Sequence, residues 1–273
     1  MNLEASMRKA AKDLLNQKKV DLIIGYEAGS LPLRTTPCFI RKPNDVEKLV
    51  LNPTCDDNLA RYLLDREEKR IGIVAKGCDT RSILVVLSEK QIPRENMVII
   101  GVPCLGVINR RKIEAEVGSR EILEASVTNE EVTVSGEGFS RTLKTDDLLC
   151  DECTTCEHRN PLLYDVLVGR EAPELTKVEA FAEVSSFEAK SAEEKWTYFK
   201  EEFKNCIRCY ACRNACPLCY CKECFVDLTT PLWLGKTDNP SDVMVFHIVR
   251  ALHVAGRCVD CGACSRACPM GIK

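Results

Sequence analysis

Residues 206–217 read CIRCYACRNACP, and 52 positions later residues 258–269 read CVDCGACSRACP. Each copy has two gaps of two residues, one gap of three residues, and a final proline. Three closely spaced cysteines let one tight loop hold three corners of a four-iron cube, while the fourth cysteine reaches the other cube. The repeat predicts two [4Fe-4S] clusters with crossed ligands: Cys206, Cys209, Cys212 and Cys268 for one, and Cys258, Cys261, Cys264 and Cys216 for the other.

This segment, roughly residues 200–273, resembles the bacterial two-cluster ferredoxins. The gap between the two motifs is longer here, and it holds three further cysteines, Cys219, Cys221 and Cys224, before a helical pattern over 241–255. The three cysteines could anchor another cluster with a fourth ligand from elsewhere. They could also be buried thiols or a substitute ligand set. His247 and His253 lie on the helical pattern, where a packed or hydrogen-bonded role is expected before metal ligation.

Cysteine usage points to metal. Of 18 cysteines, 11 fall between residues 206 and 268, and the chain begins without the apolar segment of an export signal. In a reducing cytosol, clustered cysteines bind metal more often than they form disulfides. The 38 basic and 41 acidic residues give no reason to expect nucleic acid, and no apolar run is long enough for a membrane span. We therefore expect a cytoplasmic protein.

The first part of the chain alternates apolar runs with helical patterns. Expected strands lie at 20–25, 49–51, 71–75 and 97–102, and expected helices at 3–19, 57–68 and 80–90. This alternation predicts an α/β domain with a mainly parallel sheet, to which a hairpin at 122–134 is added. We expect this domain at 1–169, a glutamate-rich linker at 170–195, and a two-cluster ferredoxin-like α+β domain at 196–273.

A second cysteine group ends the first domain. Cys150, Cys153 and Cys156 again have gaps of two residues. The fourth ligand could come from an upstream set placed next to expected strand ends, namely Cys55, Cys78 and Cys104, because loops converge at the carboxyl ends of parallel strands. A third [4Fe-4S] cluster is the favoured interpretation. Zinc held by the same thiolates, or plain buried cysteines, are the alternatives.

Residues 20–170 carry a second resemblance. The runs GYEAG at 25–29, AKGCDTR at 75–81 and IIGVPCLG at 99–106 resemble the coenzyme F420 hydrogenase and dehydrogenase beta-subunit family, which includes formate dehydrogenase beta subunits. The resemblance implies a subunit that carries clusters, and a flavin such as FAD, between a catalytic partner and an electron acceptor. Lys76 and Arg81, at an expected helix start, could hold a flavin phosphate, although surface charge accounts for either equally well.

These features predict an iron-sulfur electron-transfer subunit of a larger oxidoreductase, such as a formate dehydrogenase, a hydrogenase or a heterodisulfide-reductase-like complex. Its partners would be a catalytic dehydrogenase or hydrogenase, or a flavoprotein. No acid-base pair or dinucleotide fingerprint is recognisable, so no independent catalytic activity is expected. The alternative is a flavoenzyme that itself reduces a ferredoxin, a nicotinamide or a deazaflavin.

Overall fold

The structure is a computed structural model that describes residues 2–66, 70–175 and 181–273. The chain forms two compact units. Unit 1 comprises residues 1–178 together with 259–261, and unit 2 comprises residues 179–258 together with 262–273.

Unit 1 is built on a mixed five-stranded sheet with the order β2-β1-β3-β4-β8. The three inner strands are parallel neighbours, β1 (Leu22–Ala28), β3 (Ile71–Ala75) and β4 (Met97–Gly101), and β8 (Val166–Leu167) extends the parallel part. Only β2 (Thr35–Ile40) runs antiparallel, at the edge. Every residue of β3 is buried, as expected for a parallel strand covered on both faces. The predicted α/β class with a mainly parallel sheet is confirmed for unit 1.

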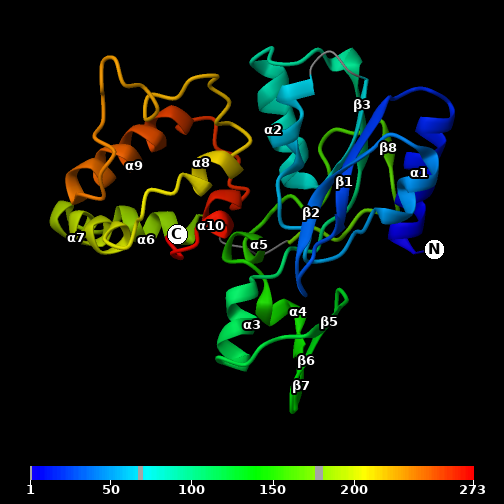
Figure 1. The fold of residues 1–273 in the computed structure, drawn as a ribbon, viewed down its shortest axis with the longest axis horizontal. Helices are drawn as coiled ribbons and strands as arrows, with labels where there is room; N and C mark the ends of the chain where they lie inside the picture. The colour runs from blue at the N-terminus through cyan, green and yellow to red at the C-terminus, as the bar shows by residue number, and fades with distance from the viewer. Residues whose placement is uncertain (1, 67–69, 176–180) are drawn as a thin grey trace. The chain divides into compact units, whose positions relative to one another are not determined.

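Two helices cover the sheet. α1 (Leu3–Asn16) and α2 (Gly77–Ser88) lie on opposite sides of the strands (Figure 1). α1 buries an apolar stripe, Met7, Ala11, Leu14 and Leu15, and the side chain of Asn2 caps it by accepting the N–H of Glu4. α2 follows β3 directly, so its first turn stands at the carboxyl end of that strand. This is the edge of the sheet at which the candidate site of unit 1 is assembled.

Two expected elements of this region are wrong. Residues 49–51, which follow a 3-10 helix (Pro43–Lys48), form no strand: only Leu49 makes an isolated bridge, with Glu27, and its side chain packs over Gly25 of β1. Residues 57–66 form two short 3-10 helices, Leu59–Tyr62 and Leu64–Arg66, rather than one α-helix, and the end of the expected helix lies outside the described residues. A further 3-10 helix, Arg94–Asn96, precedes β4.

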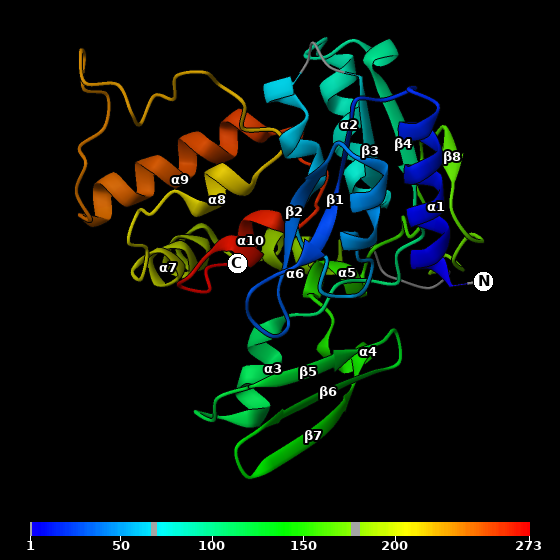
Figure 2. The same cartoon turned by 45° about the vertical axis from the view of Figure 1, so that its right-hand side comes forward.

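The expected hairpin belongs to a separate sheet. β5 (Glu124–Val127), β6 (Glu131–Gly136) and β7 (Phe139–Lys144) form an antiparallel three-stranded sheet that is not joined to the first one, which corrects the expectation of a hairpin added to it (Figure 2). α3 (Arg110–Val117) and α4 (Thr145–Leu148) lie next to it. A second core fills this lobe, with Ile113, Val132, Val134 and Leu148 buried together. α5 (Asp151–Thr154) then leads back to the first sheet.

The described residues of unit 2 form helices and loops. α6 (Ala182–Glu188) and α7 (Ala192–Phe203) precede the first cysteine motif, and α9 (Pro240–Val254) lies in the long segment between the motifs. Each motif ends in one short helix, α8 (Ala211–Ala215) or α10 (Ala263–Ala267), and these two helices pack against each other. None of the helices among the described residues combines the length and the apolar character needed to cross a bilayer.

Candidate iron-sulfur sites

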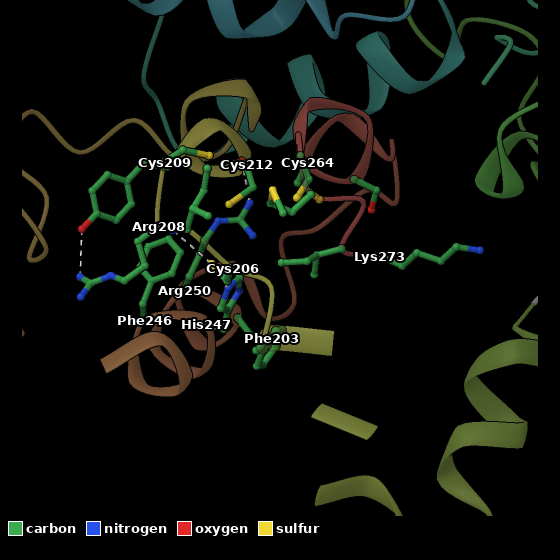
Figure 3. A pocket seen from close by; sticks show the side chains of 17 residues that line it. Phe203, Cys206, Arg208, Cys209, Cys212, Phe246, His247, Arg250, Cys264 and Lys273 are labelled. Atoms are coloured by element: carbon green, nitrogen blue, oxygen red, sulfur yellow. Dashed lines mark hydrogen bonds between the residues drawn. The ribbon is translucent and has the colours of Figure 1, made fainter. Parts of the chain in front are cut away.

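Unit 2 contains a cavity of about 180 Å³ whose wall carries the first predicted ligand set. Cys206, Cys209 and Cys212 come from the first motif and Cys268 from the second, and all four line the cavity (Figure 3). Cys264, expected for the other cluster, lies on the same wall. Burial raises the pKa of Cys206, and the nearby Cys268 and Cys209 raise it further, so these thiols are close enough to interact. Side chains 62 positions apart in the sequence are thus brought to one place.

Both motif loops have the same backbone shape. Arg208 and Asp260, at matching positions, have φ of 51° and 52°, and Tyr210 and Gly262 have φ of 60° and 67°. These left-handed residues turn the loop around its cysteines. In the first motif the turn directs the N–H of Arg208 toward the sulfur of Cys206, at 3.4 Å. A sulfur that accepts backbone N–H groups is suited to carry negative charge, which a cluster thiolate does.

Two arginines, Arg208 and the half-buried Arg250, place positive charge on the wall of the cavity. The guanidinium of Arg250 donates to the carbonyl of Cys212 at 3.0 Å, and it interacts with the charges of Cys212 and Cys264. Arg208, only 8% exposed, donates to the carbonyls of Gly235 and Thr237. The Nε atoms of both arginines are buried without a hydrogen-bond partner in the structure. Unsatisfied buried donors in two residues that line the cavity fit an anionic group there.

His247, on α9, also lines the cavity. Its Nε2 lies 3.3 Å from the sulfur of Cys206. Its ring is stacked on Phe203, with centroids 4.0 Å apart and planes 7° apart, and it meets the edge of Phe246. Burial, and then the charges of Arg250 and Arg208, lower the pKa of His247 to about 4. The histidine is packed and hydrogen-bonded as expected, but the sequence did not indicate that it faces a predicted ligand.

The second predicted set is divided between the units: Cys216, Cys258 and Cys264 belong to unit 2, and Cys261 to unit 1. Cys216 donates a hydrogen bond to Cys219, and this bond lowers the pKa of Cys219 to about 7. Cys224 interacts with Arg213, while Cys221 is exposed. The structure therefore places two of the three additional cysteines close to the end of the first motif. Their role stays a prediction.

In unit 1, three of the predicted cysteines lie together at the carboxyl ends of β3 and β4. The charges of Cys78 and Cys104 interact, and so do those of Cys104 and Cys156. The N–H of Gly106 points to the sulfur of Cys104, at 3.4 Å, as the N–H of Arg208 does in unit 2. Burial raises the pKa of Cys104 and that of Cys78.

The other candidates of unit 1 are placed differently. A Cβ added to Gly106 would lie 3.3 Å from the Cβ of Cys153, so Cys153 adjoins the Cys104 loop. Cys150 is 1% exposed and precedes α5. Cys55 is equally buried, and its sulfur lies 3.8 Å from the carbonyl oxygen of Val50. Cys38, which has no ligand spacing, is buried as well, and burial raises its pKa to about 12.

Lys76 is enclosed in unit 1, with a side chain only 4% exposed. Its ammonium donates to the hydroxyl of Tyr26 and to the carbonyls of Cys55 and Asp57, the latter two at 2.9 and 3.0 Å, and lies 3.4 Å from the carboxylate of Asp79. Burial by itself would lower the pKa of Lys76, but Asp79 and the nearby thiols outweigh burial and raise it. The three N–H donors of the Lys76 ammonium are used by Tyr26, Cys55 and Asp57, so Lys76 offers none at the surface for a phosphate.

Arg81 is placed differently from Lys76. It lies on α2, and its Nε is buried without a hydrogen-bond partner in the structure. The Nε of Arg159 is likewise buried without a hydrogen-bond partner in the structure. The segment that contains Arg159 packs against the start of α2, where Leu162 N–H donates to Thr80 at 3.0 Å. Two unsatisfied guanidinium donors therefore lie in neighbouring segments, an arrangement that fits an anionic ligand.

The spread of the thiols bears on the choice between zinc and a cluster. Among the residues that the structure describes, no three Cys, His, Asp or Glu side chains converge closely enough to hold a single metal ion. Zinc requires its sulfurs about 2.3 Å from one ion. Cys206, Cys209, Cys212 and Cys268 line one cavity, and the choice of a cluster over zinc there stays a prediction.

Comparison with known proteins adds an independent observation. No protein-family model matches the chain. A curated protein from Methanocaldococcus jannaschii, the F420-dependent formate dehydrogenase subunit beta, is 25% identical over 96% of this chain and 84% of its own length. This chain is similar to formate dehydrogenase beta subunits. The resemblance stated from the GYEAG, AKGCDTR and IIGVPCLG runs is thereby confirmed.

The comparisons also include a second curated relative and a solved structure. The F420-dependent formate dehydrogenase 1 subunit beta of Methanococcus maripaludis is 24% identical over 89% of this chain and 78% of its own length. Among solved structures, a chain of the F420-reducing [NiFe] hydrogenase complex from Methanosarcina barkeri aligns with 57% of this chain and 59% of its own length, at 15% identity and a TM-score of 0.43. By their names, both formate dehydrogenase relatives are subunits of F420-dependent enzymes.

Proposed function

We propose that this chain is an iron-sulfur electron-transfer subunit of a multi-subunit oxidoreductase, of the formate dehydrogenase, hydrogenase or heterodisulfide-reductase-like kind. The observation that carries the proposal is that Cys206, Cys209 and Cys212 of one motif share a cavity with Cys268 of the other. The names of the two formate dehydrogenase relatives support a role within a complex. A cytoplasmic location and the boundaries 1–169, 170–195 and 196–273 stay predictions that accompany it.

A [4Fe-4S] cluster held at such a site supplies transfer of one electron at a time. The residues of this chain would hold the cluster and set its surroundings. The left-handed loop of the first motif fixes the sulfurs and aims the N–H of Arg208 at Cys206. Arg208 and Arg250 bring positive charge to the wall of the cavity, which favours a negatively charged group there. The apolar contacts of Phe203 and Phe246 limit the access of water on the side of α9.

For unit 1 we propose a third cluster, held by Cys153, Cys156 and Cys104, with Cys78 or Cys150 as the remaining ligand. The interactions of Cys104 with Cys156 and with Cys78 support this set. Cys55 is a weaker candidate because its thiol lies against the carbonyl of Val50. The N–H of Gly106 points to the sulfur of Cys104, as the N–H of Arg208 points to the sulfur of Cys206 in the first site.

Iron analysis of the anaerobically purified, full-length chain tests the proposal. We expect at least eight iron atoms, two cubes of four, and more when unit 1 is filled. The Cys268→Ser variant should lose the cluster that Cys206, Cys209 and Cys212 support, although it changes only the far end of the chain. Cys38→Ser is the matched control, because Cys38 is buried outside both sites. Stoichiometric zinc, or a full iron content in Cys268→Ser, would contradict the proposal.

A second function is favoured by one observation in unit 1. The buried, unsatisfied Nε atoms of Arg81 and Arg159 fit an anionic ligand such as the phosphates of FAD. In that case the chain would be a flavoenzyme that itself reduces a ferredoxin, a nicotinamide or a deazaflavin. Two results would support this function over a pure electron relay. One is a bound flavin, with an absorbance band at about 450 nm that is lost in Arg81→Met, and the other is turnover by the isolated chain.

A further inference from the structure

The helix between the two motifs contributes more than packing to the first site. α9 comes from the long segment that separates the motifs, and it places His247 and Arg250, one turn apart, on the wall of the cavity. Figure 3 shows the His247 ring between Phe203 and Phe246, directed toward Cys206. The distance of 3.3 Å from Nε2 to the sulfur is within the range of a hydrogen bond to sulfur.

The ring is held in place from two sides. Phe203, the last residue of α7, lies parallel to it at 4.0 Å, and Phe246 meets it at an angle of 68°. An imidazole stacked in this way has little freedom to rotate away from Cys206. The orientation is therefore set by packing, and the contact to sulfur does not depend on a flexible side chain.

The chemistry of the partner fixes the direction of the hydrogen bond. A cysteine sulfur that serves as a metal ligand is a thiolate, which has no proton and only accepts. The Nε2 atom must then carry the proton and donate it. A hydrogen bond to such a sulfur stabilises the more negative, reduced state of a cluster relative to the oxidised state, and hydrogen bonds to sulfur are among the determinants of cluster potential.

We propose that His247 donates its Nε2–H to the sulfur of Cys206 and thereby raises the reduction potential of the cluster at the first site. The proposal rests on the proposed function, because it needs a cluster there. It assigns to α9 the role of tuning one cluster of the pair. His247 is a positioning and tuning residue rather than a ligand.

The test uses the full-length chain, loaded with iron and sulfide, and an EPR-monitored redox titration. His247→Phe keeps a ring that can stack but removes the N–H, whereas His247→Gln keeps an N–H donor. We expect the potential of one cluster to fall in His247→Phe by the equivalent of about a tenfold change in the equilibrium constant, about 59 mV for one electron. His247→Gln should remain close to the wild type.

His253→Phe is the matched control. His253 lies on the same helix, is exposed, and contacts Phe225 instead of the cavity. All potentials should be unchanged in this variant. Unchanged potentials in His247→Phe, or an equal fall in His247→Phe and His247→Gln, would overturn the proposal, because neither result requires the N–H.

A measurement on the wild type does not depend on how the variants fold. With 15N-labelled histidine, the reduced cluster at this site should show a nitrogen hyperfine coupling from a histidine that is not a ligand, and the coupling should vanish in His247→Phe or His247→Gln. Absence of that coupling in the wild type would overturn the proposal. Failure of the proposed function is distinct, since it would appear as a wild-type iron content below eight atoms before any potential is measured.

Discussion

Replacing Lys76 by methionine should destabilise unit 1 by about 3 kcal/mol, because the change removes one partner of a buried ion pair. The side chains of Lys76 and Asp79 are 4% and 0% exposed, and the ammonium also serves the carbonyls of Cys55 and Asp57. Loss of one charge from a buried pair typically costs about 3–5 kcal/mol. The lower value applies here because Asp79 keeps hydrogen bonds from two backbone N–H groups, those of Lys76 and Leu59, at 2.8 and 2.9 Å.

Hydrogen exchange followed by mass spectrometry is the suitable assay, because both tryptophans, Trp196 and Trp233, lie in unit 2 and do not report on unit 1. A loss of about 3 kcal/mol accelerates exchange in peptides from β3 and α2 by roughly 100-fold where exchange needs unfolding of the unit. In the double variant Lys76→Met/Asp79→Asn both charges are gone, but the amide can accept only one of the two backbone N–H groups of Lys76 and Leu59, so only part of the stability should return. Exchange in Lys76→Met within a few-fold of the wild type would refute the reasoning.

The sign of the pH dependence follows from the same contacts. Because the folded chain raises the pKa of Lys76, the stabilisation is fully present below a pH of about 10.4, the pKa of lysine in an unfolded chain. It is lost only as the pH rises through the higher value of the folded state. The difference between Lys76→Met and the wild type should therefore be constant between pH 6 and pH 9, to within about 0.5 kcal/mol.

Two further predictions concern buried side chains. Phe246→Ala should destabilise unit 2 by about 3–5 kcal/mol, because Phe246 is 1% exposed and packs with Val226 and Leu234. Urea unfolding monitored by tryptophan fluorescence measures this loss of stability. As a control, Val245→Ala, at an exposed position of the same helix, should change stability by less than about 0.5 kcal/mol. Equal midpoints for the two variants would contradict the packing. Cys38 should resist alkylation by iodoacetamide at pH 8 in the folded chain, because burial raises its pKa to about 12, and should react once the chain is unfolded; peptide mass mapping distinguishes the two states.

The sheet of unit 1 was predictable where strands are buried on both faces. β3 and β4 are short apolar runs with a helix between them, and they pair in parallel as expected. The edge strand β2 escaped prediction because its sequence, TTPCFI, contains Pro37, which suits only an edge position. Residues 49–51 were assigned wrongly because a short apolar run does not reveal how far it pairs: Leu49 makes only an isolated bridge with Glu27 and packs over Gly25.

The candidate site, too, was predictable from the sequence only in part. Cysteine spacing is local information, so the first ligand set could be written down from the motifs, and the structure brings its members to one cavity. The contact of His247 with Cys206 depends on where α9 packs, 41 positions away in the sequence, and no pattern in the helix specifies that place. The burial of Lys76 could not be foreseen either, because a lysine before a helix is usually exposed and its enclosure requires Tyr26 and Asp79 from separate elements.

Tyr210 and Gly262 occupy the same left-handed position in the two motif loops. Glycine adopts this conformation without strain, whereas a side chain there costs about 1–2 kcal/mol. In the first loop that cost is offset by contacts of the tyrosine ring with Phe246 of α9 and by the hydrogen bond that its hydroxyl accepts from Arg208. The two copies of the duplicated motif are therefore no longer interchangeable in evolution. A recombination event that copied the second loop over the first would preserve every cysteine and still remove the tyrosine ring that packs against Phe246 of α9.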